Sequence, residues 1–208
     1  MKSFTEEIGI NGHLTIIKQY TDGQEEVVFD DHNIIVSGMG TGLAALFTGS
    51  GSNSVLDYQI DRFQLGTSGR ATGVATDVLE VSSTYQLSGA LTKSQYGGGS
   101  NLYIEEANLI RPAGSWGANV AFALIPAGKI TKISDTAVRY TLVVDEEAAN
   151  GLVDSAGTTA YLSEIGLLMK NPFGLTGTNS SMLVAYRTFT AIEKTSDFSL
   201  IFRWTLNF

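Results

Sequence analysis

The sequence predicts an all-β protein: a single antiparallel β-sandwich, jelly-roll-like, with one short helix near residues 38–47. Three observations support this fold class. Glycine is abundant, with 23 of 208 residues, while proline occurs only three times. Charged residues make up 16% of the chain, below the roughly 25% that is usual for globular proteins. Short runs of alternating apolar and polar residues are separated by Gly, Ser and Thr, as expected for strands joined by turns.

The first elements are a hairpin, a helix and a strand. Residues 13–20 and 25–29 are β-rich, and Asp22-Gly23 between them is a strong hairpin signal because Gly tolerates positive φ. Residues 37–47 place apolar side chains on one helical face, and Ser37 is the predicted N-cap. Residues 58–65 follow as the next strand, since their apolar side chains nearly alternate.

The middle of the chain contains shorter strand signals. Residues 95–101 include three consecutive glycines and are predicted to form a loop. No second helix is expected. Between residues 78 and 169, the predicted strands are 78–87, 102–110, 119–125, 129–133, 138–144 and 161–169.

The last two strands are 182–192 and 198–208, and they are predicted to pair directly because 193–197 has a typical hairpin length. In the final strand, apolar and polar side chains alternate, so one face is buried. That buried face is predicted to hold the core aromatics Phe202, Trp204 and Phe208.

The chain is expected to form one domain. Its length fits a single core, and no composition shift marks a clear boundary. Residues 1–11 have no strong pattern and are predicted to be an N-terminal arm. Residues 12–208 are then the β-sandwich domain.

Composition argues against several classes of site. The absence of cysteine excludes disulfides and thiolate metal sites, and two histidines are too few for a histidine-based metal centre. Neither a cofactor nor a metal is therefore expected. A net charge of −8 with scattered Lys and Arg disfavours nucleic acid as a partner. No apolar run approaches a membrane span, and residues 1–10 do not resemble a signal peptide, so assembly in a cytoplasm is expected.

No catalytic residues are predicted, and the protein is not expected to be an enzyme. His32 follows Asp30 and Asp31, but in a strand Asp31 and His32 point to opposite faces, and no nucleophile elbow is present. The carboxylate doublets are separated in the same way, so none forms a facing catalytic pair. Tyr96, Tyr103 and Trp116 lie near glycine-rich loops and leave a glycan as a possible partner.

Two charged residues lie inside apolar strands. Glu164 is in 161–169 and Arg187 is in 182–192. Burying a lone charge is costly unless it is paired. A structural ion pair between Glu164 and Arg187 is therefore one interpretation, and exposure of both side chains is the other.

Seven segments occur in an order that is more informative than any one of them. Together they cover roughly residues 30–80 and 138–208. They are DHNIIV (31–36), LAAL (43–46), FQLGT (63–67), SEIGLL (163–168), LVAYRTF (183–189), IEK (192–194) and the strand 200–208 with its tryptophan. This order resembles a loose group of tailed-bacteriophage virion proteins found among tail-fibre, collar and baseplate-associated components.

The resemblance implies a non-enzymatic structural component of a phage particle, placed in the neck or collar, the baseplate or the tail-fibre attachment region. Its partners are then other virion proteins and symmetric copies of itself, and its location is the virion. A capsid decoration protein and a carbohydrate- or receptor-binding module remain as alternatives. Low charge and small side chains also suit surfaces that become covered.

Overall fold

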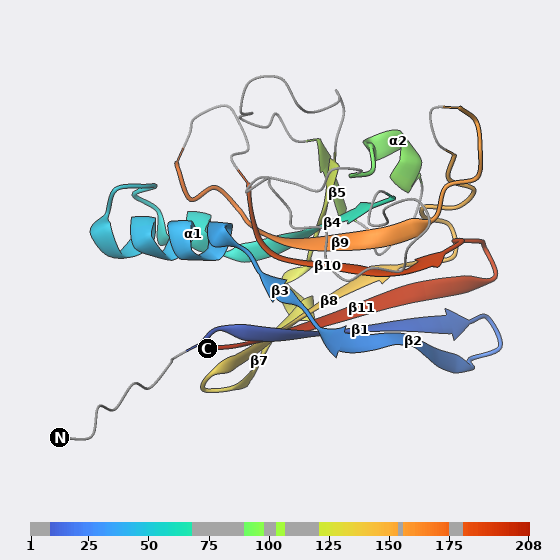
Figure 1. Cartoon of the computed structure of the whole chain (residues 1–208), viewed down its shortest axis with the longest axis horizontal. Coiled ribbons are helices and arrows are strands. Elements are labelled where there is room, and N and C mark those ends of the chain that lie inside the picture. The colour runs from blue at the N-terminus through green and yellow to red at the C-terminus, as the bar shows by residue number, and fades with distance from the viewer. Residues whose placement is uncertain (1–8, 68–89, 98–102, 107–120, 154–155, 175–180) are drawn as a thin grey trace.

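The computed structural model describes residues 9–67, 90–97, 103–106, 121–153, 156–174 and 181–208. Two antiparallel sheets form a sandwich, with one helix of substantial length at one end (Figure 1). The predicted fold class is thus confirmed. The five-stranded sheet has the order β2 (Glu25–His32), β1 (Asn11–Tyr20), β11 (Phe198–Asn207), β8 (Ala137–Val144), β7 (Ile130–Ser134). The six-stranded sheet has the order β3 (Ile34–Ile35), β10 (Met182–Ile192), β9 (Leu162–Met169), β4 (Ile60–Gly66), β6 (Ala121–Leu124), β5 (Tyr103–Glu106).

The chain passes repeatedly between the two sheets. β1 and β2 lie in the five-stranded sheet, β3 to β6 in the other, β7 and β8 back in the first, β9 and β10 in the second, and β11 in the first again. Each change of sheet ties the two layers together covalently. Strands remote in sequence therefore become neighbours, as β1 and β11 do.

The predicted first hairpin is confirmed. β1 pairs with β2 in antiparallel register, and Gly23 in the turn has φ +87°. The turn closes through a hydrogen bond from the Tyr20 amide to the Gln24 carbonyl at 2.8 Å. Positive φ is the conformation that favours glycine at this position.

The helix α1 spans Ser37–Thr48 and confirms the predicted segment, but Ser37 is not its cap. Val36 has the extended N-cap conformation, and no side chain donates or accepts a capping hydrogen bond there. Ser37 is already the first helical residue, so its hydroxyl cannot reach the amides that an N-cap serves. Gly49 ends the helix with φ +65°, a left-handed C-terminal residue.

Short helical turns appear where only loops were expected. α2 (Lys93–Tyr96) begins two residues before the predicted loop 95–101 and ends inside it. A capping box between Thr92 and Gln95 stabilises so short a helix locally. Two 3-10 turns, η1 (Val55–Tyr58) and η2 (Ala127–Lys129), precede β4 and β7. The strand predicted at 78–87 lies outside the described residues, as do residues 1–8 of the predicted arm.

The predicted direct pairing of the last two strands is wrong. β10 pairs with β3 and β9, while β11 pairs with β1 and β8 in the opposite sheet. Five residues, 193–197, span at most roughly 17 Å when extended. Stacked sheets lie only about 10 Å apart, so this connection is as suitable for crossing the sandwich as for a hairpin.

The core lies between the sheets and contains most of the predicted aromatic face. Phe202 and Trp204 are fully buried, with Leu200 and Leu206 beside them. Phe208 contradicts the prediction, since it is 45% exposed. β11 ends at Asn207, so Phe208 continues the alternation beyond the paired strand and reaches only the rim of the sandwich.

Candidate functional site

An apolar cavity of about 520 Å³ opens at the helical end of the sandwich. α1 and η1 form one wall, and residues of both sheets form the others. No charged side chain lines it. The lining residues are Met39, Leu43, Tyr58, Gln59, Ile60, Ala127, Ile130, Val138, Tyr140, Met169 and Phe208.

Two glycines allow α1 to pack closely against the six-stranded sheet. A Cβ on Gly38 would lie 2.0 Å from the Leu183 carbonyl oxygen, and one on Gly42 would lie 2.6 Å from the Met169 sulfur. Only glycine permits so close an approach of helix to strand. The helix is thereby held where Met39 and Leu43 face the cavity.

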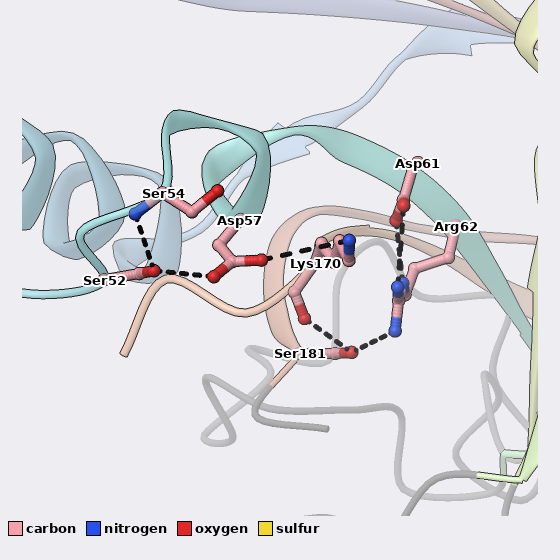
Figure 2. A network of polar contacts seen from close by, with 7 residues as sticks. All are labelled: Ser52, Ser54, Asp57, Asp61, Arg62, Lys170 and Ser181. Atoms are coloured by element: carbon pink, nitrogen blue, oxygen red, sulfur yellow. Dashed lines mark hydrogen bonds and ion pairs between the residues drawn. The ribbon is translucent and has the colours of Figure 1, made fainter. Parts of the chain in front are cut away.

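A polar network behind η1 fixes the adjacent wall (Figure 2). The Ser52 hydroxyl donates to the Asp57 carboxylate at 2.6 Å, and that carboxylate lies 3.8 Å from the Lys170 ammonium. The Lys170 amide donates to the Gln59 carbonyl at 2.8 Å. Since Tyr58 and Gln59 line the cavity, the network positions them against the end of β9.

The same network extends to a buried arginine. Arg62 is 1% exposed and pairs with Asp61 at 2.7 Å (Figure 2). Its guanidinium also donates to the Ser181 hydroxyl, which in turn donates to the Lys170 carbonyl at 3.1 Å. The start of β10, the end of β9 and the start of β4 are therefore joined by hydrogen bonds that include a charged group.

Exposed apolar side chains occur on the two elements that wall the cavity. Phe47 at the end of α1 is 81% exposed, and Val55 and Leu56 in η1 are 73% and 60% exposed. Residues 36–56 contain no Asp, Glu, Lys, Arg or His. An uncharged apolar surface beside an apolar cavity is a feature of protein interaction sites.

Two buried phenols line the cavity, Tyr58 and Tyr140. Burial raises the pKa of Tyr140 to about 12, because the ionised phenolate loses hydration in this environment. The Tyr140 phenol is therefore neutral at physiological pH. The cavity offers shape and apolar contact, with no ionised group among its lining residues.

The predicted Glu164–Arg187 ion pair does not form. Thr188 lies opposite Glu164 and Arg187 lies opposite Ile165, so alternation places Glu164 and Arg187 on opposite faces of the sheet. Glu164 is fully buried and accepts a hydrogen bond from the Tyr186 hydroxyl at 3.2 Å.

Arg187 instead points toward the other sheet. Its guanidinium pairs with Asp31 of β2 and lies over the Phe29 ring, 5.3 Å from the ring centre. The Arg187 side chain is 14% exposed. The expectation that a strand-interior arginine needs a partner is met, but the partner comes from the opposite sheet.

The two histidines meet on the exposed face of the β1–β2 hairpin. His13 lies edge-on to His32 and contacts the Asp30 carboxylate at 2.7 Å. The Thr15 hydroxyl donates to the same Asp30 oxygen. These hydrogen bonds lower the pKa of Asp30, and the hydrogen bond with His13 has the larger effect. The carboxylate lies between histidine and hydroxyl, whereas a catalytic triad needs the histidine in the centre.

Other residues considered for binding lie elsewhere. Tyr96 is fully buried, and its hydroxyl accepts a hydrogen bond from the Leu65 amide, so it is not a sugar-stacking surface. The Tyr103 side chain and Trp116 lie outside the described residues. Within the described part of the chain, no group of three or more His, Asp or Glu residues could hold a metal ion.

The sequence did not predict the apolar cavity or the exposed apolar side chains of Phe47, Val55 and Leu56 on the elements that wall it. One signal was available: the uncharged stretch 36–56, which lies within a span, 33–56, that has no ionisable side chain. The cavity itself draws on residues from both sheets, spread from Met39 to Phe208, which no local pattern brings together.

Comparison with protein-family models, curated proteins and solved structures finds no match to this chain. No helix in the described ranges is long and apolar enough to cross a membrane. The geometry of the site is therefore the principal guide to function.

Proposed function

We propose that this chain is a non-enzymatic structural component of a tailed-phage particle, acting through protein–protein contacts. The observation that carries the proposal is the exposed apolar surface of Phe47, Val55 and Leu56 beside the apolar cavity. We call this the α1–η1 surface. The order of sequence segments that resembles virion proteins supports the phage assignment.

The occupant that fits the α1–η1 surface is a second copy of this chain. Each copy carries a net charge of −8, so like-charge repulsion opposes contact over most of the surface. The α1–η1 surface belongs to the uncharged stretch 36–56, where two copies meet without that penalty. A contact between the same surface on two copies is self-complementary and relates the two copies by a twofold axis.

The strand edges are less suited to this contact. β2 forms one edge of the five-stranded sheet and carries Glu25, Glu26, Asp30 and Asp31. Charged side chains on an edge strand oppose pairing with another chain. Association through the α1–η1 surface is therefore favoured over sheet extension at β2.

Two charge insertions test the contact. Phe47→Glu and Leu56→Glu place carboxylates on the α1–η1 surface, and Val27→Glu makes the same kind of change at an apolar residue of β2 that is 60% exposed. Light scattering over a range of micromolar concentrations should show self-association for the wild type and Val27→Glu, and monomers for the other two. A wild-type protein that stays monomeric throughout, or a Val27→Glu variant that alone dissociates, contradicts the assigned surface.

The phage assignment has a separate test. A cryo-EM map of a particle containing this chain should show several copies related by symmetry, at the collar, the baseplate or a fibre attachment point. A single copy without symmetric neighbours contradicts the structural role. Copies bound at capsid hexon centres would identify a decoration protein, and specific binding on a glycan array would identify a receptor-binding module.

A further inference from the structure

A buried lysine lies in the connection between β10 and β11. Lys194 is 2% exposed, and its ammonium donates to the Asn150 side-chain oxygen at 2.9 Å and to the Thr195 carbonyl at 2.7 Å. The Phe198 ring centre is 5.4 Å away. The buried amine is thus directed at the side-chain amide of Asn150 and lies beside an aromatic ring.

Both polar atoms of the Asn150 side-chain amide form hydrogen bonds. Its nitrogen donates to the Glu146 backbone carbonyl, while its oxygen accepts from Lys194. The backbone on either side is left-handed, with φ +57° at Ala149 and +58° at Gly151. Ala149 is the only non-glycine residue with positive φ in the described part of the chain, and such strain tends to accompany functional positions.

The surroundings favour the neutral amine that nucleophilic attack requires. Burial lowers the pKa of Lys194 to about 8, although the carboxylates of Asp145, Glu146 and Asp197 oppose that shift. A lysine desolvated in this way is the usual form of an amine nucleophile. Asp145 is 6% exposed and exerts the largest electrostatic effect of the three on Lys194.

We propose that Lys194 and Asn150 form an intramolecular isopeptide bond. The lone pair of the neutral Nζ attacks Cγ of Asn150, and a Nζ–Cγ bond forms. A carboxyl group, assigned to Asp145, carries the proton lost by Nζ to the departing amide nitrogen. The Cγ–Nδ2 bond then breaks, ammonia leaves, and a secondary amide joins the two side chains. No oxidant or further reactant is needed.

The bond links two parts of the sandwich. Asn150 lies in the loop after β8, and Lys194 lies in the connection that crosses from β10 to β11. The Gly151 amide already donates to the Lys194 carbonyl at 3.3 Å. A covalent link here closes a loop of the chain, which removes conformational freedom from the unfolded state. Asn150 is exposed, so the released ammonia has a route to solvent.

Mass spectrometry of the purified full chain tests the proposal. The folded wild type, incubated at pH 9, should have the sequence mass minus one molecule of ammonia, and a tryptic digest should contain one branched peptide joining the segments of Asn150 and Lys194. Lys194→Arg and Asn150→Ala should keep their full sequence masses. Lys170→Arg, a matched control at a lysine 40% exposed in its side chain, should lose ammonia as the wild type does.

Two results would contradict the proposed isopeptide bond. One is a folded wild type that retains its full mass after incubation at pH 9. The other is loss of ammonia without a branched peptide, which would place the reaction between Asn150 and the backbone of Gly151. Wild type incubated in denaturant should not react, because the reaction depends on the folded arrangement. The rate should rise about tenfold per pH unit up to the pKa of Lys194 and level off above it.

Discussion

At the residue scale, the largely buried arginine Arg187 is paired across the sandwich. Arg187 lies in β10 and Asp31 in β2, so their ion pair joins the two sheets at an edge. The Arg187 Nε has no hydrogen-bond partner among the described residues. Its remaining interactions with Asp31 and the Phe29 ring are therefore the principal compensation for its burial.

Asp31→Ala should destabilise the protein, because it leaves Arg187 buried without its carboxylate. The expected loss is about 1–2 kcal/mol, at the low end for a buried charged group because Asp31 is half-exposed. Urea unfolding measures it. Asp135→Ala removes the partner of Lys132 in a pair that is largely exposed and should change stability by no more than about 0.5 kcal/mol. Equal losses for the two variants would contradict the role of Arg187.

The raised pKa of Tyr140 predicts how the stability of the protein changes at alkaline pH. Burial raises this pKa from 10.0 to about 12, so between these values the folded protein keeps a proton that the unfolded chain releases. Stability is then complete below pH 10 and falls as the pH rises toward 12. Tyr140→Phe should flatten that fall in denaturant titrations. Tyr161→Phe controls for loss of an exposed phenol, and identical slopes in both variants would contradict the prediction.

At the scale of elements, helix α1 is positioned by close backbone contact more than by intrinsic helical preference. It contains three glycines, Gly38, Gly40 and Gly42, and Gly49 follows as its C-cap. Glycine lowers helix stability. The buried ones are needed for contact with β10 and Met169, whereas Gly40 has no atom within 4 Å of an added Cβ.

Gly38→Ala should destabilise the protein by about 1–3 kcal/mol, because the new methyl group overlaps the Leu183 carbonyl. Gly40→Ala makes the same chemical change on the exposed side of the helix and should stabilise by about 0.5–1 kcal/mol. Thermal unfolding of both variants measures the difference. A neutral Gly38→Ala would show that α1 does not pack against β10 as described, and would also weaken the assigned cavity wall.

At the scale of the whole molecule, the fold depends on pairing between distant parts of the chain. β11 lies in the centre of the five-stranded sheet, with β1 on one side and β8 on the other. Asn11 lies opposite Asn207. Such non-local pairing must overcome a large loop-closure entropy before it contributes stability.

A chain that lacks residues 198–208 should therefore fail to fold, since both β1 and β8 lose their central partner. Circular dichroism and urea titration should show no cooperative transition for this truncation. Removal of Phe208 alone leaves β11 intact and should preserve cooperative unfolding. A truncated chain that still unfolds cooperatively would contradict the central role of β11.

The sequence alone determined the kind of structure that several of the longer segments adopt. Alternation in 198–208 identified a strand with a buried face, and Leu200, Phe202, Trp204 and Leu206 are all fully buried. The Asp22-Gly23 turn and the helix near 38–47 were likewise correctly predicted. These are local properties, because side-chain periodicity and turn chemistry depend on residues a few positions apart.

The tertiary structure decided which elements are partners. A five-residue connection fits both a hairpin and a crossing between sheets, so the choice for β10 and β11 depended on the whole sandwich. Glu164 and Arg187 each needed a partner, but only the register placed them on opposite faces. The cavity and the contact of Lys194 with Asn150 join residues far apart in the chain. Packing of two complete sheets brings such residues together, and no local sequence pattern encodes it.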